Sequence, residues 1–161
     1  MRALFFLLAF AVAGCGFSPL YAPPPGGGPV IGAVSIGTIP GKAGHVLRNE
    51  LTRMLAAEGA DGPAQPLEIA LRERVSRLGL RTDESASRAD LTLTARYTLT
   101  PPQGRPVRGT VQSVATYVIP TAAFAEIAAQ DDARERAAEE LARRIRADLA
   151  LRLAQSRRRA G

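Results

Sequence analysis

The sequence predicts an α+β fold: a two-layer sandwich in which a mostly antiparallel four-stranded sheet carries two helices packed on one face. Three observations lead to this prediction. A β-branched run at 30–36 precedes a helical pattern at 43–58, three strand-like segments fill the middle of the chain, and residues 121–153 contain no proline or glycine. The order strand, helix, three meandering strands, helix is typical of helices that gather on one side of a sheet.

The first two elements follow from apolar spacing. The Val- and Ile-rich run at 30–36 predicts a strand that is buried on both sides or lies near the sheet centre. After Pro40-Gly41, the residues Leu47, Leu51, Met54 and Leu55 recur at intervals of three and four. This spacing places them on one face of a helix over 43–58.

Three strands are predicted from residue alternation. The apolar residues Leu67, Ile69, Leu71 and Val75 fall on odd positions. Leu78 and Leu80 fall on even positions, so we expect a bulge or the strand's end near Ser76. Residues 82–89 are polar and are expected to form a loop. Residues 90–99 alternate without a fault, and the turn-forming segment 101–104 leads into a return strand over 105–118.

The last predicted element is a long helix. Ala137, Leu141, Ile145 and Leu149 repeat at intervals of four within 121–153, which predicts a helix with one apolar stripe. Residues 156–161 are expected to form a basic, frayed C-terminal tail. The folded domain is therefore assigned to residues 30–155.

The N-terminal segment has the pattern of a secretory signal. Arg2, an apolar run over 3–11 and small residues before Cys15 predict a signal peptide at 1–14, too short to cross a bilayer. Val12-Ala13-Gly14-Cys15 resembles the bacterial lipobox, which implies a diacylglycerol thioether on Cys15 and acylation, for example by palmitate, of its new amine. Residues 15–29 are rich in proline and glycine and predict a lipid-anchored tether. The alternative is an ordinary signal peptide with a buried structural cysteine.

Composition narrows the function. The chain of 161 residues has a net charge of +6, and Lys42 is its only lysine. Arginine favours bidentate pairing with phosphate or carboxylate. A secreted location argues against nucleic acid, which leaves anionic lipid or lipopolysaccharide as the partner. There is no Ser/His/Asp set, metal-ligand spacing or glycine-rich phosphate loop, so we expect no enzyme, no cofactor and no metal.

The segment Cys15-Gly16-Phe17-Ser18-Pro19-Leu20-Tyr21 resembles the mature start of the LptE lipoproteins, especially alphaproteobacterial ones, and 47–51 and 130–136 are also similar. The resemblance implies a non-catalytic lipoprotein that plugs an LptD-like β-barrel, assists its assembly and binds lipopolysaccharide during its insertion into the outer membrane. In many enterobacterial lipoproteins an Asp after the lipidated cysteine retains the protein at the inner membrane. This chain has Gly16 at that position, so the resemblance implies a location on the periplasmic side of the outer membrane. The alternatives are a pilotin-like escort of a secretin and a cell-wall-binding or hydrolytic lipoprotein.

Candidate ligand contacts come from the solvent face of the predicted sheet. Hairpins centred near Ser85 and Pro102 would align Arg74, Arg96 and Arg108 in one row on neighbouring strands. Such a row could pair with lipid A phosphates or with acidic residues of a barrel. Further candidates are Arg72 on the same face and the loop residues Arg81 and Arg88. The alternative is that these arginines only keep an exposed sheet soluble.

Overall fold

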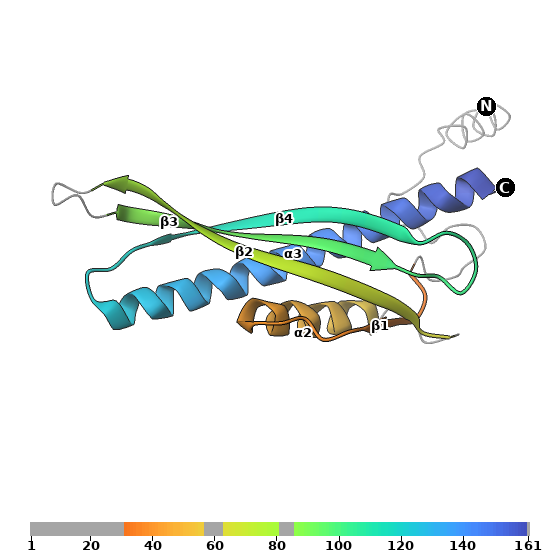
Figure 1. The fold of residues 1–161 in the computed structure, drawn as a ribbon, viewed down its shortest axis with the longest axis horizontal. Helices are drawn as coiled ribbons and strands as arrows, with labels where there is room; N and C mark the ends of the chain where they lie inside the picture. Colours follow the sequence, from red (N-terminus) through yellow and green to blue (C-terminus); the bar gives the residue numbers. More distant parts are fainter. Residues whose placement is uncertain (1–30, 57–62, 81–85, 161) are drawn as a thin grey trace, which may run out of the picture.

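The computed structural model describes residues 31–56, 63–80 and 86–160. Within them the elements are β1 (Val34–Ile36), α2 (Lys42–Ala56), β2 (Gln65–Leu80), β3 (Ala86–Leu99), β4 (Val107–Val118) and α3 (Ala123–Ala160). The strands form one sheet in the order β1-β2-β3-β4, in which β1 runs parallel to β2 and the other pairs are antiparallel (Figure 1). The predicted signal peptide, the tether with Cys15, and Arg81 lie outside the described residues.

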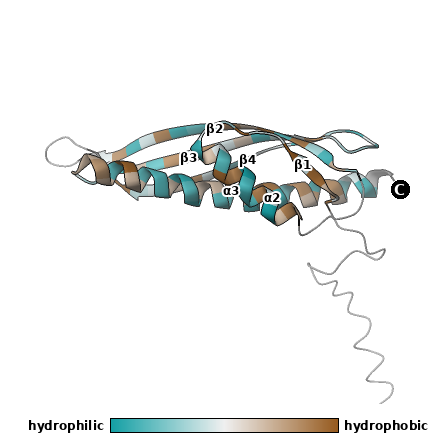
Figure 2. Cartoon of the chain, turned by 90° about the horizontal axis from the view of Figure 1, so that it is seen from below, coloured by the Kyte–Doolittle hydropathy of each residue, from teal (hydrophilic) through white to brown (hydrophobic). Residues whose placement is uncertain are grey.

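One face of the sheet is buried under the helices. Figure 2 shows α2 and α3 on the same side of the sheet, which confirms the predicted α+β fold. The alternating residues of β3 point toward the helices and are fully or almost fully buried: Leu91, Leu93, Ala95, Tyr97 and Leu99. The predicted stripe of α3 meets them, and its members are equally buried: Ala137, Leu141, Ile145 and Leu149. The core therefore lies between β3, β4 and α3, with α2 packed beside α3.

The first strand differs from its prediction. β1 has only three residues and lies at the edge of the sheet, not near its centre. Two apolar residues that flank it, Ile31 and Ile39, are buried in the core although neither belongs to the strand. Part of the β-branched run therefore packs into the core as an irregular segment. Residue type alone does not distinguish such a segment from a buried strand.

The hairpin between β2 and β3 also differs. Its register runs in step from Leu67↔Leu99 to Leu80↔Ala86, so there is no bulge near Ser76 and residues from Ala86 onward belong to β3. Val75 and Leu78 point to opposite faces and are 37% and 43% exposed. The side chains of this part of β2 are exposed on both faces, so burial does not set the alternation of its apolar residues.

The C-terminal segment is helical. We expected the long helix to end near Leu153 and residues 156–161 to form a frayed tail, but α3 continues to Ala160. Alanine, leucine and arginine are strong helix formers, and no helix-breaking residue occurs before Gly161. At about 1.5 Å per residue, the 38 residues of α3 span roughly 57 Å.

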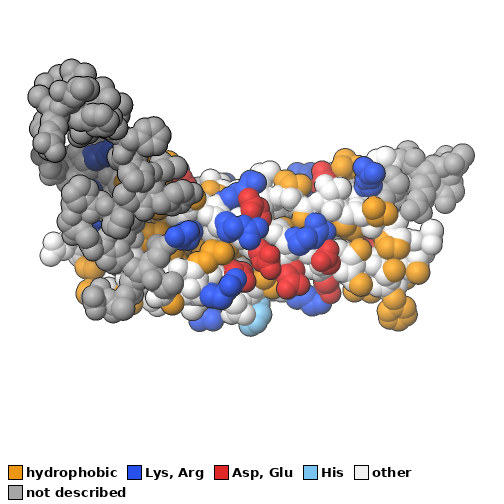
Figure 3. Space-filling view, turned by 180° about the vertical axis from the view of Figure 1, so that it is seen from behind, with side chains coloured by type: hydrophobic (Ala, Val, Ile, Leu, Met, Phe, Trp, Pro, Cys, Tyr) orange, Lys and Arg blue, Asp and Glu red, His pale blue; other side chains and the backbone are white. Residues whose placement is uncertain are grey.

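Ion pairs join the two helices to the sheet on the covered side. Arg134 of α3 donates to Glu73 of β2 at 2.8 Å and to Asp131 at 2.6 Å, and Asp131 accepts from Lys42 of α2 at 2.9 Å. Asp131 and Arg134, two charged residues of the segment 130–136, thus link α3 to α2 and to β2. Figure 3 shows the helix side of the molecule, where basic and acidic side chains are interleaved.

Leu141→Ala tests the packing of α3 against the sheet. Leu141 is fully buried, so the substitution should lower the free energy of unfolding by about 2–5 kcal/mol. The matched control is Leu151→Ala in the same helix, where the side chain is 57% exposed and the expected change is within about 0.5 kcal/mol. Denaturant unfolding measures both. Equal effects at the two positions would contradict the described packing.

Candidate functional site

The sheet surface that faces away from the helices is the candidate site, and we name it the open sheet face. Because the register pairs even-numbered residues with even-numbered residues across all three long strands, their even-numbered side chains share this face. It carries five arginines, which are Arg72, Arg74, Arg88, Arg96 and Arg108, against the two acidic residues Glu68 and Asp90. All five arginines are exposed. The open sheet face thus has an excess of positive charge.

None of these arginines forms an ion pair with another described residue. Of the two acids on the face, Asp90 already accepts a hydrogen bond from the hydroxyl of Thr116 at 2.6 Å. The guanidinium groups are therefore available to an external anion.

Two of the arginines line a shallow groove of about 550 Å³ in the open sheet face, which we name the arginine groove. Its lining comes from three strands, with Arg74 opposite Thr92, Arg72 opposite Thr94, and Thr94 opposite Gln112. Glu73 also lines the groove, but its carboxylate accepts from Arg134 of α3 on the helix side. Neighbouring strands lie about 4.8 Å apart, and residues two positions apart on a strand lie about 6.8 Å apart. Two guanidinium groups, two hydroxyls and one amide thus lie within the span of a phosphate-bearing headgroup.

The predicted single row of arginines is wrong. Arg74 lies opposite Thr92, Arg96 lies opposite Ala70 and Thr110, and Arg108 lies opposite Thr98. Along the strands this separates Arg74 from Arg96 by about 13 Å and Arg96 from Arg108 by about 7 Å. The offset between Arg74 and Arg96 arises at the β2–β3 turn. The predicted hairpin is centred near Ser85, but β3 already begins at Ala86, so the turn lies nearer the N-terminus than predicted.

The structure distributes the other predicted contacts over the length of the face. Arg72 joins Arg74 in the arginine groove, whereas Arg88 lies opposite Val118 at the far end of β4. Arg108 lines a different pocket at the opposite end. Sequence reasoning assigned Thr92, Thr94 and Gln112 to the solvent face but not to a site, because only the register shows which arginines they neighbour.

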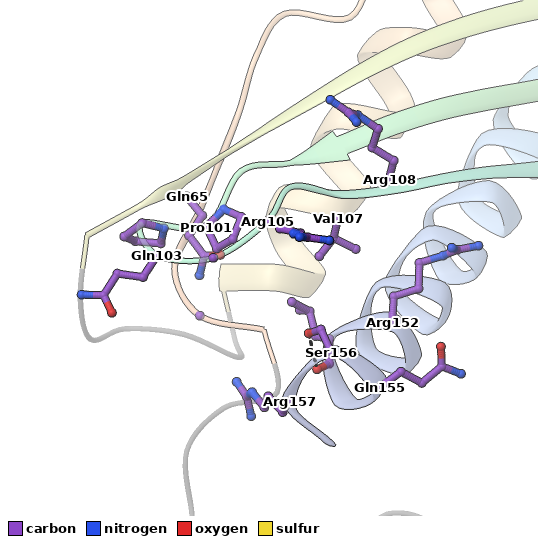
Figure 4. Close-up of a pocket in the computed structure, with 14 residues that line it drawn as sticks. Gln65, Pro101, Gln103, Arg105, Val107, Arg108, Arg152, Gln155, Ser156 and Arg157 are labelled. Atoms are coloured by element: carbon purple, nitrogen blue, oxygen red, sulfur yellow. Dashed lines mark hydrogen bonds between the residues drawn. The ribbon is translucent and has the colours of Figure 1, made fainter. Parts of the chain in front are cut away.

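A larger pocket of about 780 Å³ lies at the end of the molecule, between the turn at 101–104, Gly32 and the C-terminal part of α3 (Figure 4). Four arginines line it: Arg105, Arg108, Arg152 and Arg157. Their guanidinium groups point in different directions in Figure 4 and do not surround a common point. No sequence signal connects these residues, since they come from β4, the segment before it and α3. The arginine groove is the better candidate because its arginines lie two residues apart on the same face of one strand.

Arg152 has a structural role. Its Nε donates to Asp148 at 2.9 Å, and the hydroxyl of Tyr97 donates to the same carboxylate oxygen at 2.5 Å. Gly109 lies opposite Tyr97, and a Cβ there would come within 2.3 Å of the Tyr97 hydroxyl. The absence of a side chain at position 109 therefore lets Tyr97 reach across β4 to α3.

These contacts shift the ionisation of both partners. Burial, followed by the hydrogen bond to Asp148, raises the pKa of Tyr97 above its usual value. Burial opposes ionisation of Asp148, but the hydrogen bonds from Arg152 and Tyr97 outweigh it and lower the pKa of this carboxyl. The carboxylate is thus held charged between β3 and α3.

Over residues 31–56, 63–80 and 86–160, no group of three His, Cys, Asp or Glu side chains is placed to hold a metal ion. In those ranges no helix has the length and apolar character needed to cross a membrane.

The structure is thus a small α+β domain with a sheet covered on one face and a basic open face, whose arginines have no ion pair with another described residue. The family model described as LptE, lipopolysaccharide-assembly, matches residues 31–149. The chain belongs to the LptE family of lipopolysaccharide-assembly proteins. No curated protein sequence matches it.

Solved structures share the fold. A lipoprotein from Caulobacter crescentus CB15 is 31% identical with a TM-score of 0.61, and the match covers 75% of this chain and 90% of that one. A minor lipoprotein from Acinetobacter baumannii is 18% identical with a TM-score of 0.59, over 75% and 92% of the two chains. Rare lipoprotein B from Shewanella oneidensis is 14% identical with a TM-score of 0.51, over 71% and 92%.

Asp148→Asn tests the contact between Tyr97, Asp148 and Arg152. Because the pKa of Asp148 is lowered in the folded state, its ionised form stabilises the protein above about pH 4, and this stabilisation is lost as the pH falls. The variant should be about 1–3 kcal/mol less stable at pH 7 and should lose less stability than wild type between pH 7 and pH 3. Thermal unfolding across that range measures both. Asp132→Asn, in an exposed ion pair of the same helix, is the control; an equal change there would exclude a specific contribution from Asp148.

Proposed function

We propose that this lipoprotein is anchored through Cys15 on the periplasmic side of the outer membrane and acts as the non-catalytic partner of an LptD-like β-barrel. It would plug the barrel, assist its assembly and bind lipopolysaccharide during insertion into the outer membrane. The observation that carries the proposal is the open sheet face, where five arginines have no ion pair with a described residue. Membership of the LptE family supports the same partner and ligand.

The chemistry of the arginine groove suits a phosphate-bearing glycolipid headgroup. Arg72 and Arg74 offer two planar guanidinium groups, and Thr92, Thr94 and Gln112 add neutral polar groups beside them. Guanidinium pairs bidentately with phosphate, and such charge-assisted hydrogen bonds are shorter and stronger than neutral ones. Binding through these groups should weaken as salt concentration rises.

The shape and polarity of the domain suit a place within a barrel. The interior of an outer-membrane barrel is polar, and the open sheet face is made mainly of threonine and arginine. The long α3 gives the domain an elongated form along its strands (Figure 1). A polar, elongated body can enter a water-filled lumen without burying an apolar face there.

Charge reversal in the arginine groove tests ligand binding. The double variant Arg72→Glu, Arg74→Glu should weaken lipopolysaccharide binding about 10- to 100-fold, because it removes two charge-assisted contacts and adds repulsion. The control is Arg136→Glu, Arg143→Glu on α3, which changes the net charge equally in exposed ion pairs on the helix side. Affinity is measured across a salt series after circular dichroism confirms the fold. Equal weakening by both double variants would indicate attraction by net charge alone and would contradict a site at the groove.

Cys15→Ser tests the anchor and the partner in the same cells. The hydroxyl cannot replace the thiol in thioether formation, so the variant should remain an uncleaved or mislocalised precursor without lipid label. Co-purification of a β-barrel with the wild-type protein, but not with this variant, is the expected result. Normal maturation of the variant would refute the lipoprotein anchor, and recovery of a secretin ring with wild type would favour the pilotin-like alternative.

A further inference from the structure

β4 forms one edge of the sheet and has no second strand partner among the described residues. The direction of its free backbone groups follows from the hydrogen-bond pattern. Thr100 N–H donates to the Pro66 carbonyl, so the even-numbered residues of β3 bond to β2 and the odd-numbered ones bond to β4. The even-numbered residues of β4 must then direct their N–H and C=O groups outward. The carbonyl of Gln112 does so, because Arg144 of α3 donates to it at 2.6 Å.

The two long edges of the sheet differ in charge. Beyond β1, the free edge of β2 carries Glu68, Arg72, Glu73, Arg74 and Arg77, and such charges protect an edge strand against pairing with other chains. In β4 the only charged residue is Arg108, near the start of the strand. β4 is therefore the edge whose composition permits another strand to pair with it.

Arg144 restricts the available part of β4 to its second half. It occupies the Gln112 carbonyl, so pairing there would displace a guanidinium group. From Val114 to Val118 no described residue makes such a contact with the outward backbone groups, and the side chains of Val114 and Val118 are 48% and 59% exposed. Two exposed valines flank Thr116, whose hydroxyl is held by Asp90. This segment presents unpaired backbone groups beside apolar side chains.

We propose that the Val114–Val118 edge of β4 is extended by a loop segment of the β-barrel partner, because strands in the wall of a closed barrel are already paired on both edges. The loop segment adds to the sheet as an extra strand through main-chain hydrogen bonds. The inference rests on the function proposed above and specifies how the partner is held. An uncharged edge offers nothing to an anionic glycan or lipid headgroup, but it matches an uncharged extended peptide.

A second copy of the chain fits this edge less well. Each copy carries a net charge of +6, and a five-residue segment is far shorter than the roughly 20–30 residues that a standard interface uses on each side. A loop segment of an enclosing barrel gains the rest of its interface from other contacts between the barrel and the domain.

Proline substitution separates strand addition from folding. Val114→Pro removes an outward N–H without removing a hydrogen bond to β3, and proline is tolerated on edge strands in this orientation. The variant should reduce the barrel recovered with the lipoprotein at least fivefold while leaving its lipopolysaccharide affinity unchanged. The matched control is Val75→Pro, which removes an outward N–H from the charged edge of β2 and should leave recovery of the barrel unchanged.

A photo-crosslinking amino acid at position 118 gives a readout that does not depend on the proline variants. It should crosslink to the barrel in cells, whereas the same group at Ser76 on β2 should not. If wild type recovers the barrel but Val114→Pro does so equally and position 118 gives no crosslink, strand addition is refuted and the proposed function stands. Crosslinking of position 118 only to a second copy would also refute it. If wild type recovers no barrel, the proposed function fails and the inference fails with it.

Discussion

The packing of α3 across a single face of the sheet is the constraint on which the other features depend. Alanines at 133, 137, 138 and 142 are buried, and their small side chains let the helix approach the strands closely. The hydroxyl of the buried Ser113 donates to the Ala137 carbonyl at 2.7 Å. A hydrogen bond therefore joins β4 to α3 in addition to the apolar packing. Since both helices lie on this side, the opposite face is left to solvent and to ligands.

Elements with a buried face were predictable, because burial imposes a period on the sequence. The alternation at 90–99 and the four-residue repeat from Ala137 to Leu149 both correspond to buried surfaces in the structure. The pattern failed where no such constraint acts. The β2 side chains from Val75 to Leu78 are exposed on both faces, and Ile31 and Ile39 enter the core from outside any strand. Alternation then carries no information about strand ends.

The candidate site was predictable in kind but not in arrangement. Period-two spacing assigns Arg72, Arg74, Arg96 and Arg108 to one face, and the structure finds all four exposed there. Which of them lie together depends on the register, and a shift of the β2–β3 turn moves cross-strand partners by several positions. That turn is polar and carries no signal for its own centre, so the neighbours of Arg74 could not be deduced from the sequence.

The length of α3 also sets how far apart the two ends of the domain lie. The described chain starts near the C-terminal end of α3, since Gly32 lines the same pocket as Arg157, while the β2–β3 hairpin occupies the opposite end (Figure 1). Between them α3 acts as a rigid spacer of roughly 57 Å. The two ends are therefore too far apart to contact the same small molecule, and each can meet a different environment.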